Sequence, residues 1–222
     1  LEEADAARLL AALHDVPPQY SAMVQLGLFT GMRRGEICGL RWSDIDFNAS
    51  TISVNRTVEY IPHEGLIFTA PKTRASNRTF KVGSNCLDML REYQLYQKSE
   101  RLRVGSAWAR TVRVENGKTV QNDLLFTRWD GTPLDLNKVT TWFPRFLRAH
   151  DLPAVTVHSL RHTYASLMIA SHVPIVTVAG RLGHAQTSTT TDIYAGFIKT
   201  ADAAASDVME GVFDRIKEKS HA

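Results

Sequence analysis

The chain has few of the features that mark secreted, membrane or metal-dependent proteins. Two cysteines in 222 residues, Cys38 and Cys86, cannot form a disulfide framework, so we interpret them as small core residues in a reducing compartment. No apolar run approaches the length of a membrane span, and the acidic start LEEADAARLL does not match a secretory signal. Carboxylates do not cluster as a Mg²⁺ site requires, and thiolates are too few for a Zn²⁺ site. These absences predict a cytoplasmic protein without a membrane segment, a metal or another cofactor.

A strong excess of one charge is also missing. The 26 basic and 23 acidic side chains leave a net charge of +3, which by itself does not identify a nucleic-acid-binding protein. Hydrophobic residues make up 44% of the chain, which is ordinary for a globular protein with a sizeable core. Much of the middle is basic, whereas acidic residues gather at the two ends: Glu2, Glu3, Asp5, Asp202, Asp207 and Glu210.

The spacing of apolar residues predicts a mainly α protein with a small antiparallel β-sheet. Thr51–Val58 alternates and is rich in β-branched residues, and Leu66–Ala70 and Arg78–Val82 could pair with it as strands. The segment PKTRASN between the last two strands has the composition of a basic turn, and residues 105–123 are expected to form a surface loop or hairpin. The predicted helices cover residues 6–13, 20–29, 33–40, 85–103, 134–150, 158–171, 174–183, 188–194 and 201–217.

The stretch HSLRHTY, from His158 to Tyr164, places two histidines, an arginine and a tyrosine within seven residues. On a helix His158 and Arg161 share a face. Chance placement would also produce such a pair in a chain with eight histidines and 18 arginines, so the spacing taken alone favours a solvated helix face. Tyr164 falls inside a helix that runs into the core, and we do not predict it to be reactive.

Other segments carry polar residues for which an ordinary structural role is the favoured interpretation when each is taken alone. TGMRRGE contains Arg33 and Glu36, which could be a surface ion pair. APKT places Lys72 on a turn, and RLGH ends in His184, which could cap a helix. Tyr194 follows a threonine-rich turn and could be a half-buried core residue.

In this order the segments resemble the tyrosine recombinase, or phage-integrase, family. The resemblance runs from about Leu9 to Ala201 and is close to the integrases of temperate phages and integrative mobile elements. It implies the tyrosine recombinase catalytic-domain fold and a protein that acts on DNA in the bacterial cytoplasm, at the nucleoid. It also implies an active site at six matching positions: Arg33, Lys72, His158, Arg161, His184 and Tyr194.

The resemblance gives each of these residues a role that suits its chemistry. Attack on a DNA phosphodiester adds charge to its oxygens, which Arg33 and Arg161 can bind through bidentate hydrogen bonds. A free phenol has a pKa of about 10, so Tyr194 needs a proton acceptor, for which His158 is the candidate. Lys72 is the candidate acid for the leaving 5′-oxygen, and His184 is expected to hydrogen-bond the scissile phosphate. With cationic side chains in these roles, neither a metal nor ATP is needed.

Further residues are expected to support the site or contact the DNA backbone. Glu36 falls where the family carries an acid that supports the first arginine, and His162 is predicted to support Arg161. The predicted DNA contacts are Arg34, Thr73, Arg74 and Arg78, with Asn77, Arg128, Lys138, Arg145 and Arg148 as further candidates. For each of these residues a solvated surface is an equal explanation. Trp142 and Trp42 are expected to be core residues, with Trp42 anchoring the turn into the sheet.

The resemblance also sets expectations for domains and partners. We expect residues 1–222 to be a single C-terminal catalytic domain, cut from a longer protein whose N-terminal DNA-binding domains are absent. The tail helix in residues 199–222 has an apolar stripe, which either packs on its own subunit or docks onto a neighbouring protomer. The expected partners are double-stranded DNA at attachment sites and, in some systems, a directionality factor. The protein is expected to be a monomer when free and a homotetramer in the synaptic complex.

Three other functions compete with a site-specific recombinase. A type IB topoisomerase uses similar arginine and tyrosine chemistry to nick and religate one strand. Two histidines flanking one arginine, together with LGH, favour the recombinase. The complete set of six polar residues argues against a non-catalytic DNA-binding module. A metal-dependent hydrolase would need histidines and carboxylates at ligand spacing, which the sequence does not contain.

Overall fold

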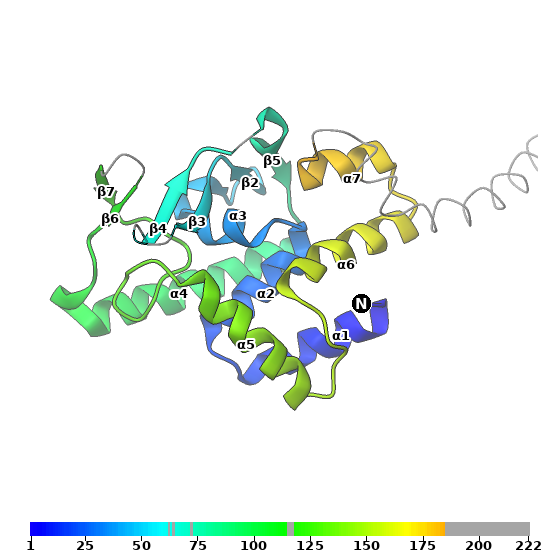
Figure 1. The fold of residues 1–222 in the computed structure, drawn as a ribbon, viewed down its shortest axis with the longest axis horizontal. Helices are drawn as coiled ribbons and strands as arrows, with labels where there is room; N and C mark the ends of the chain where they lie inside the picture. The colour runs from blue at the N-terminus through cyan, green and yellow to red at the C-terminus, as the bar shows by residue number, and fades with distance from the viewer. Residues whose placement is uncertain (62, 64, 72, 115–117, 185–222) are drawn as a thin grey trace, which may run out of the picture.

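The computed structural model describes residues 1–61, 63, 65–71, 73–114 and 118–184 (Figure 1). The helices are α1 (Glu3–Ala12), α2 (Pro18–Thr30), α3 (Arg34–Gly39), α4 (Ser84–Val104), α5 (Leu136–Ala149), α6 (Val157–Ala170) and α7 (Ile175–Leu182), with single 3₁₀ turns at η1 (Leu13–Asp15), η2 (Trp42–Asp44), η3 (Arg74–Ser76) and η4 (Gly105–Ala107). The strands are β1 (Ile45–Asp46), β2 (Thr51–Val54), β3 (Thr57–Ile61), β4 (Gly65–Thr69), β5 (Arg78–Lys81), β6 (Thr111–Arg113) and β7 (Thr119–Gln121). The predicted class, mainly α with small antiparallel sheets, is confirmed. The helices predicted over 188–194 and 201–217 lie outside the described residues.

The strands differ from the single sheet that the sequence predicts. β2 pairs with β1 and β5, whereas β3 and β4 pair only with each other. The predicted strand over 51–58 is interrupted because Asn55 and Arg56 turn aside and bind the carboxylate of Asp44 through their side chains. Residues 57–61 therefore leave the first sheet and form a separate hairpin with 65–69. Alternation within the segment identified strands but could not reveal this break, which depends on a distant carboxylate.

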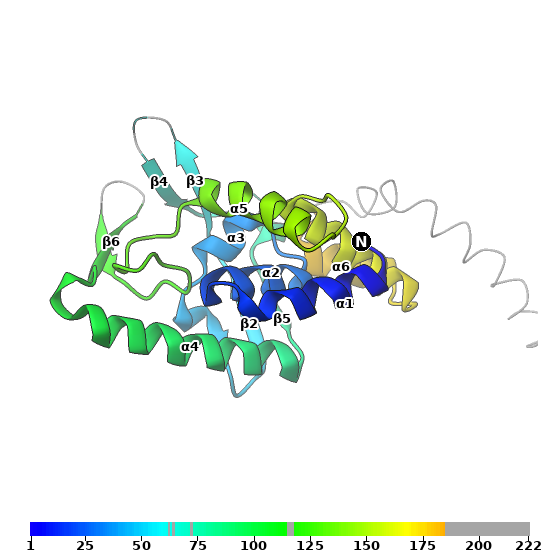
Figure 2. The same ribbon diagram turned by 90° about the horizontal axis from the view of Figure 1, so that it is seen from below.

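Helix α2 is the centre of the helical part, with contacts to α3, α4 and α6. Figure 2 shows α4 along one side of α2 and α5 along the other. Helix α2 has no polar face because both sides are covered: Met23 and Leu26 join the cluster that includes the strands and α4, and Val24 and Leu28 join the cluster with α1, α5 and α6. A smaller cluster joins α6 to α7.

The two tryptophans expected in the core, Trp42 and Trp142, are half-buried and pack against the core clusters. The ring of Trp142 stacks on Tyr20 at 4.7 Å between centroids and on Phe146 at 4.9 Å. Trp42 donates its indole N–H to Gln97 Oε1 at 2.7 Å, which ties η2 to α4. Cys38 and Cys86 are buried free thiols. Within residues 105–123, predicted as a surface loop or hairpin, β6 pairs with β7 in antiparallel orientation. Among the described residues, no helix has both the length and the apolar character to span a membrane.

Candidate active site

Arg33 lies where the chain turns from α2 into α3. Helix α2 ends at Gly31, whose φ of +64° is the left-handed conformation that favours glycine at a helix end. Arg33 is the extended N-cap of α3, and its backbone N–H donates to Glu36 Oε2 at 2.9 Å. Its Nη1 also donates to Glu36 Oε1 at 2.9 Å. The arginine side chain is 40% exposed and the glutamate 4%, so the buried carboxylate holds an arginine that reaches solvent.

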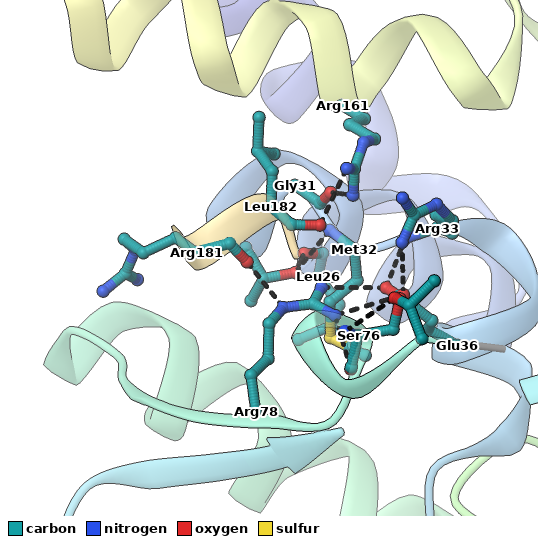
Figure 3. Close-up of polar contacts among 12 residues, drawn as sticks. Leu26, Gly31, Met32, Arg33, Glu36, Ser76, Arg78, Arg161, Arg181 and Leu182 are labelled. Carbon is teal, nitrogen blue, oxygen red and sulfur yellow. Dashed lines mark hydrogen bonds and ion pairs between the residues drawn. The ribbon is translucent and has the colours of Figure 1, made fainter. Parts of the chain in front are cut away.

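The carboxylate of Glu36 is shared by two arginines, Arg33 and Arg78 (Figure 3). Arg78 Nη2 lies 2.9 Å from Oε2 and its Nη1 3.1 Å from Oε1. Burial alone would raise the pKa of Glu36, but the hydrogen bonds and charge of Arg78 and then Arg33 outweigh it and hold the pKa below its ordinary value. Glu36 is therefore ionised at neutral pH, and the three residues carry a net positive charge.

Arg161 extends from α6 to the ends of two other helices. Arg161 is buried, with 4% of its surface exposed. Nη1 donates to the carbonyl oxygen of Gly31 at 2.9 Å and Nη2 to that of Leu182 at 2.7 Å. These carbonyls end α2 and α7, where a helix leaves acceptors without an intrahelical partner and favours positive charge. Figure 3 shows the side chain descending from α6 toward both carbonyls, beside Arg33. Arg161 thus has an orientation set by backbone from both sides.

The three predicted histidines belong to the same positive environment. His158 and His162 lie one turn apart on α6, with ring centroids 5.1 Å apart in a T-shaped contact. Desolvation lowers the pKa of His158, and the charges of His162, Arg161 and Arg33 lower it further. His184 follows the left-handed cap Gly183 of α7, and its backbone N–H donates to Ala179 O at 3.1 Å. Desolvation, followed by Arg161, Arg33, Arg78 and His162, lowers the pKa of His184 to about 4.

The structure therefore brings together most of the predicted site. Arg33 and Glu36 come from the α2–α3 junction, Arg161 and His158 from α6, and His184 from the end of α7. Both arginines act electrostatically on both histidines, although about 130 residues separate the two arginines in the sequence. Lys72 and Tyr194 lie outside the described residues. At neutral pH the histidines are neutral and the arginines charged, an arrangement that attracts an anion and can accept a proton.

The predicted DNA contacts have mixed positions. Thr73 lies in the exposed turn before β5, where its hydroxyl is 2.9 Å from that of Ser76, and Arg74 begins η3. Arg34 binds the Leu136 carbonyl and the Thr140 hydroxyl, and so ties α3 to α5. The further candidates on and before α5 are exposed: Arg128, Lys138, Arg145 and Arg148.

Arg78 departs from its expected position on the exposed turn. Its side chain is only 8% exposed and points inward to Glu36. Its Nε donates to the Arg181 carbonyl at 2.6 Å and its Nη1 to the Ser76 carbonyl at 3.0 Å. A basic residue beside a basic turn suggested a phosphate contact, but the sequence contains no signal that a buried carboxylate 42 residues earlier would be its partner.

Arg181 is a second residue whose contacts the sequence did not indicate. Its guanidinium binds the hydroxyl of Tyr164 and donates to the Lys81 carbonyl at 2.9 Å, which joins α7 to α6 and β5. Tyr164 is 6% exposed and lies within α6, as the sequence predicts for an unreactive tyrosine. Within the described part of the chain, no group of three or more metal-ligating side chains is assembled.

Comparison with known proteins places this geometry in a family. The sequence profile of the phage integrase family matches residues 1–199. The chain is 30% identical over 200 residues to a XerC-like tyrosine recombinase of Caldanaerobacter subterraneus subsp. tengcongensis, covering 86% of this chain and 49% of that protein. It is 25% identical to the integrase of Staphylococcus phage L54a, covering 89% of this chain and 55% of the other. The chain thus spans about half the length of these curated relatives.

Solved structures share the fold. The Tn1549 transposon integrase in complex with transposon right end DNA superposes with a TM-score of 0.73 at 20% identity, over 87% of this chain and 60% of that chain. XerA recombinase superposes with a TM-score of 0.66 at 23% identity, over 92% of this chain and 62% of the other. The solved structures show that the fold is shared. Membership of the family is shown by the sequence profile, which covers residues 1–199. The chain therefore belongs to the phage integrase family of tyrosine recombinases.

Proposed function

We propose that this chain is the catalytic domain of a site-specific DNA recombinase that cuts and rejoins DNA through a covalent 3′-phosphotyrosyl intermediate. The observation that carries the proposal is the convergence of Arg33, Arg161, His158 and His184 from three separate parts of the chain. Relatives named as integrases and a recombinase structure solved with transposon DNA support the same substrate class.

In this proposal the two arginines bind the scissile phosphate. Arg161 is buried and oriented by two backbone carbonyls, whereas Arg33 is more exposed and held by Glu36. Two guanidinium groups held in place by backbone carbonyls and by Glu36 stabilise the charge that develops on the non-bridging oxygens during attack. His184, neutral because its pKa is about 4, contributes a hydrogen bond to the same phosphate without adding a charge that must be desolvated.

Tyr194 supplies the nucleophile. Its phenolic oxygen bonds to phosphorus, the bond to the 5′-oxygen of the next nucleotide breaks, and the phenolic proton passes to His158. Lys72 gives a proton to the leaving 5′-oxygen. The lowered pKa of His158 keeps this imidazole neutral and able to accept a proton at neutral pH. The phosphotyrosyl link retains the bond energy, so a 5′-hydroxyl from a second duplex can reverse the step without ATP.

Strand exchange requires partners beyond one protomer. We propose a tetramer on two attachment sites, assembled from protomers that are monomeric when free, with a directionality factor where excision must be favoured. The apolar stripe of the tail, which includes Val208, Val212 and Phe213, is proposed to link protomers.

A nicked suicide substrate tests the covalent step. The chain is incubated with a duplex that carries its attachment site and a nick beside the scissile phosphate, in EDTA. We expect a covalent protein–DNA adduct that disappears in Tyr194→Phe and persists in Tyr164→Phe, the matched control. No adduct from the wild-type chain on a verified site would overturn the proposal. Exchange between two labelled duplexes then separates a recombinase from a type IB topoisomerase, which religates its own strand.

A further inference from the structure

The side chain of Arg78 joins three parts of the candidate site. It binds both carboxylate oxygens of Glu36 on α3, the carbonyl of Ser76 in the turn before β5, and the carbonyl of Arg181 at the end of α7. Its Cζ also lies 5.7 Å from the centroid of the Phe80 ring. Figure 3 shows the guanidinium between Arg181 on one side and Glu36 on the other.

The segment that carries His184 packs directly against this guanidinium. Gly183 has a φ of +69°, and a Cβ at this position would lie 2.8 Å from Arg78 Nη1 and 3.1 Å from its Cζ. The same Cβ would lie 3.1 Å from the Ala75 carbonyl. The backbone before His184 can therefore approach Arg78 and the turn only because residue 183 has no side chain. A displacement of Arg78 would move the support of His184.

The charges show a second consequence of the shared carboxylate. Arg78 donates to both oxygens of Glu36 and the side chain of Arg33 donates to Oε1, so a single carboxylate is shared by two guanidinium groups. Without Arg78, Glu36 and Arg33 would form an isolated neutral pair, and the carboxylate would compete with a phosphate for Arg33. With Arg78 present, the group keeps one positive charge in excess. The guanidinium of Arg78 makes four directed hydrogen bonds to fixed acceptors. A lysine has a single ammonium group and cannot reproduce this geometry.

We propose that Arg78 is a positioning residue, which sets Arg33 through Glu36 and the His184 segment through the Arg181 carbonyl, and does not itself bind a DNA phosphate. This inference rests on the proposed function for its effect on cleavage. The two roles can be distinguished by measurement. Loss of a positioning residue lowers the rate of adduct formation at saturating DNA, whereas loss of a phosphate ligand lowers DNA affinity and the salt dependence of that affinity.

The test compares Arg78→Met and Arg78→Lys with Arg56→Met. Arg56 also binds a buried carboxylate, Asp44, and a backbone carbonyl, but in the turn between β2 and β3. Adduct formation is measured on the suicide substrate at saturating DNA, with the half-saturating DNA concentration and its salt slope. We expect Arg78→Met to slow adduct formation on the order of 100-fold, because small displacements of catalytic groups have effects of this size. We expect Arg78→Lys to recover only part of the rate, and Arg56→Met to change it less than about threefold.

A DNA-free measurement separates this inference from the proposed function. The pKa of the His184 imidazole is measured by NMR titration in the same variants. Arg78 is one of the charges that lower this pKa, so Arg78→Met should raise it, Arg78→Lys should largely restore it, and Arg56→Met should leave it unchanged. If the wild-type chain forms no adduct, the proposed function fails while this readout still reports on the contact.

Two results would overturn the inference. In the first, Arg78→Met forms the adduct at the wild-type rate at saturating DNA, but binds DNA more weakly and with a salt slope that is smaller by about one phosphate contact. Arg78 would then be a phosphate ligand. The other is an equal loss in Arg56→Met, which would mean that any buried arginine pair affects cleavage through stability alone. Should Arg78→Met not fold, Arg78→Lys decides between the same outcomes, because it keeps the charge and removes the directed bonds.

Discussion

Two buried carboxylates, Glu36 and Asp44, look alike in isolation and differ in their surroundings. The side chain of each is 4% exposed, each accepts a backbone N–H near the start of a short helical turn, and each binds arginine. Asp44 is held by Arg56 and Asn55, with Arg41 and Asp123 nearby, so positive and negative charges balance among these described residues. Glu36 is surrounded by Arg33 and Arg78, with Arg161 acting on the same neighbouring histidine, His184.

The balance of charge around each carboxylate distinguishes a structural ion pair from a functional one in this fold. Burial of a salt bridge is weak evidence for either stability or function, because desolvation offsets much of the attraction. An uncompensated excess of positive charge is more informative, since it has a cost that an incoming anion removes. In this chain that excess lies at Glu36 and coincides with the histidines, whereas the Asp44 network only divides one long predicted strand into two.

The largest expected effect comes from neutralising each carboxylate in turn. Glu36→Gln and Asp44→Asn should each lower the free energy of unfolding by roughly 3–5 kcal/mol, because each leaves buried guanidinium groups without their partner. Only Glu36→Gln should slow adduct formation at saturating DNA, on the order of 100-fold, because Arg33 loses its anchor. DNA affinity should not fall, since a negative charge has been removed.

Urea unfolding and single-turnover adduct formation, both below the unfolding transition, measure the two quantities. Glu36→Asp is the intermediate control, with the charge kept and the reach shortened. An equal loss of cleavage in Asp44→Asn would remove the functional distinction between the two carboxylates.

An intermediate effect is expected from pH. The folded-state pKa of His184 is about 4, below its ordinary value of 6.5, so the unfolded chain binds more protons between these limits. The free energy of unfolding should therefore fall as pH decreases from about 6.5 to about 4. Glu36 adds to this only below its ordinary value of 4.5, because its lowered pKa stabilises the fold above that value and the benefit is lost on protonation.

A bound phosphate should raise the pKa of His184, because its charge offsets the charges of Arg161 and Arg33, which lower this pKa after desolvation. DNA binding should then take up protons as the pH decreases, so affinity should rise between pH 7 and pH 5.5, by at most about tenfold for each unit by which the phosphate raises the pKa. The measurement is DNA affinity against pH for the wild-type chain and His184→Asn, with unfolding followed in parallel. An affinity that does not depend on pH in either protein would mean that no phosphate approaches His184.

The smallest expected effect belongs to Tyr164. Tyr164→Phe removes the hydroxyl that binds Arg181 and should lower the free energy of unfolding by about 1 kcal/mol. The rate of adduct formation should stay within about threefold of wild type, because Arg181 keeps its contact with the Lys81 carbonyl. Thermal unfolding measures the change in stability, and the suicide-substrate assay measures the rate of adduct formation. Loss of the adduct would mean that α7, and with it the Arg78 contact, depends on this hydroxyl.

Local pattern was enough to predict the helices and several details of this protein. Helical spacing identified α1 to α7 within a few residues. The order of short polar motifs identified the family. These properties depend on periodicity and on residue types at fixed intervals, which a sequence displays directly.

The pairing of polar groups depends on how the helices and strands pack together. Arg161 meets the carbonyls of Gly31 and Leu182, and Arg78 meets Glu36, across separations of 21 to 130 residues. The break of the predicted strand at Asn55 has the same origin in a distant Asp44. Hydrogen bonds and ion pairs form between whichever groups packing brings within about 3 Å, and a basic residue has the same letter whether it faces DNA or a buried carboxylate. For that reason the sequence alone identified a site of cations and histidines, and the fold determined which of them orient the others.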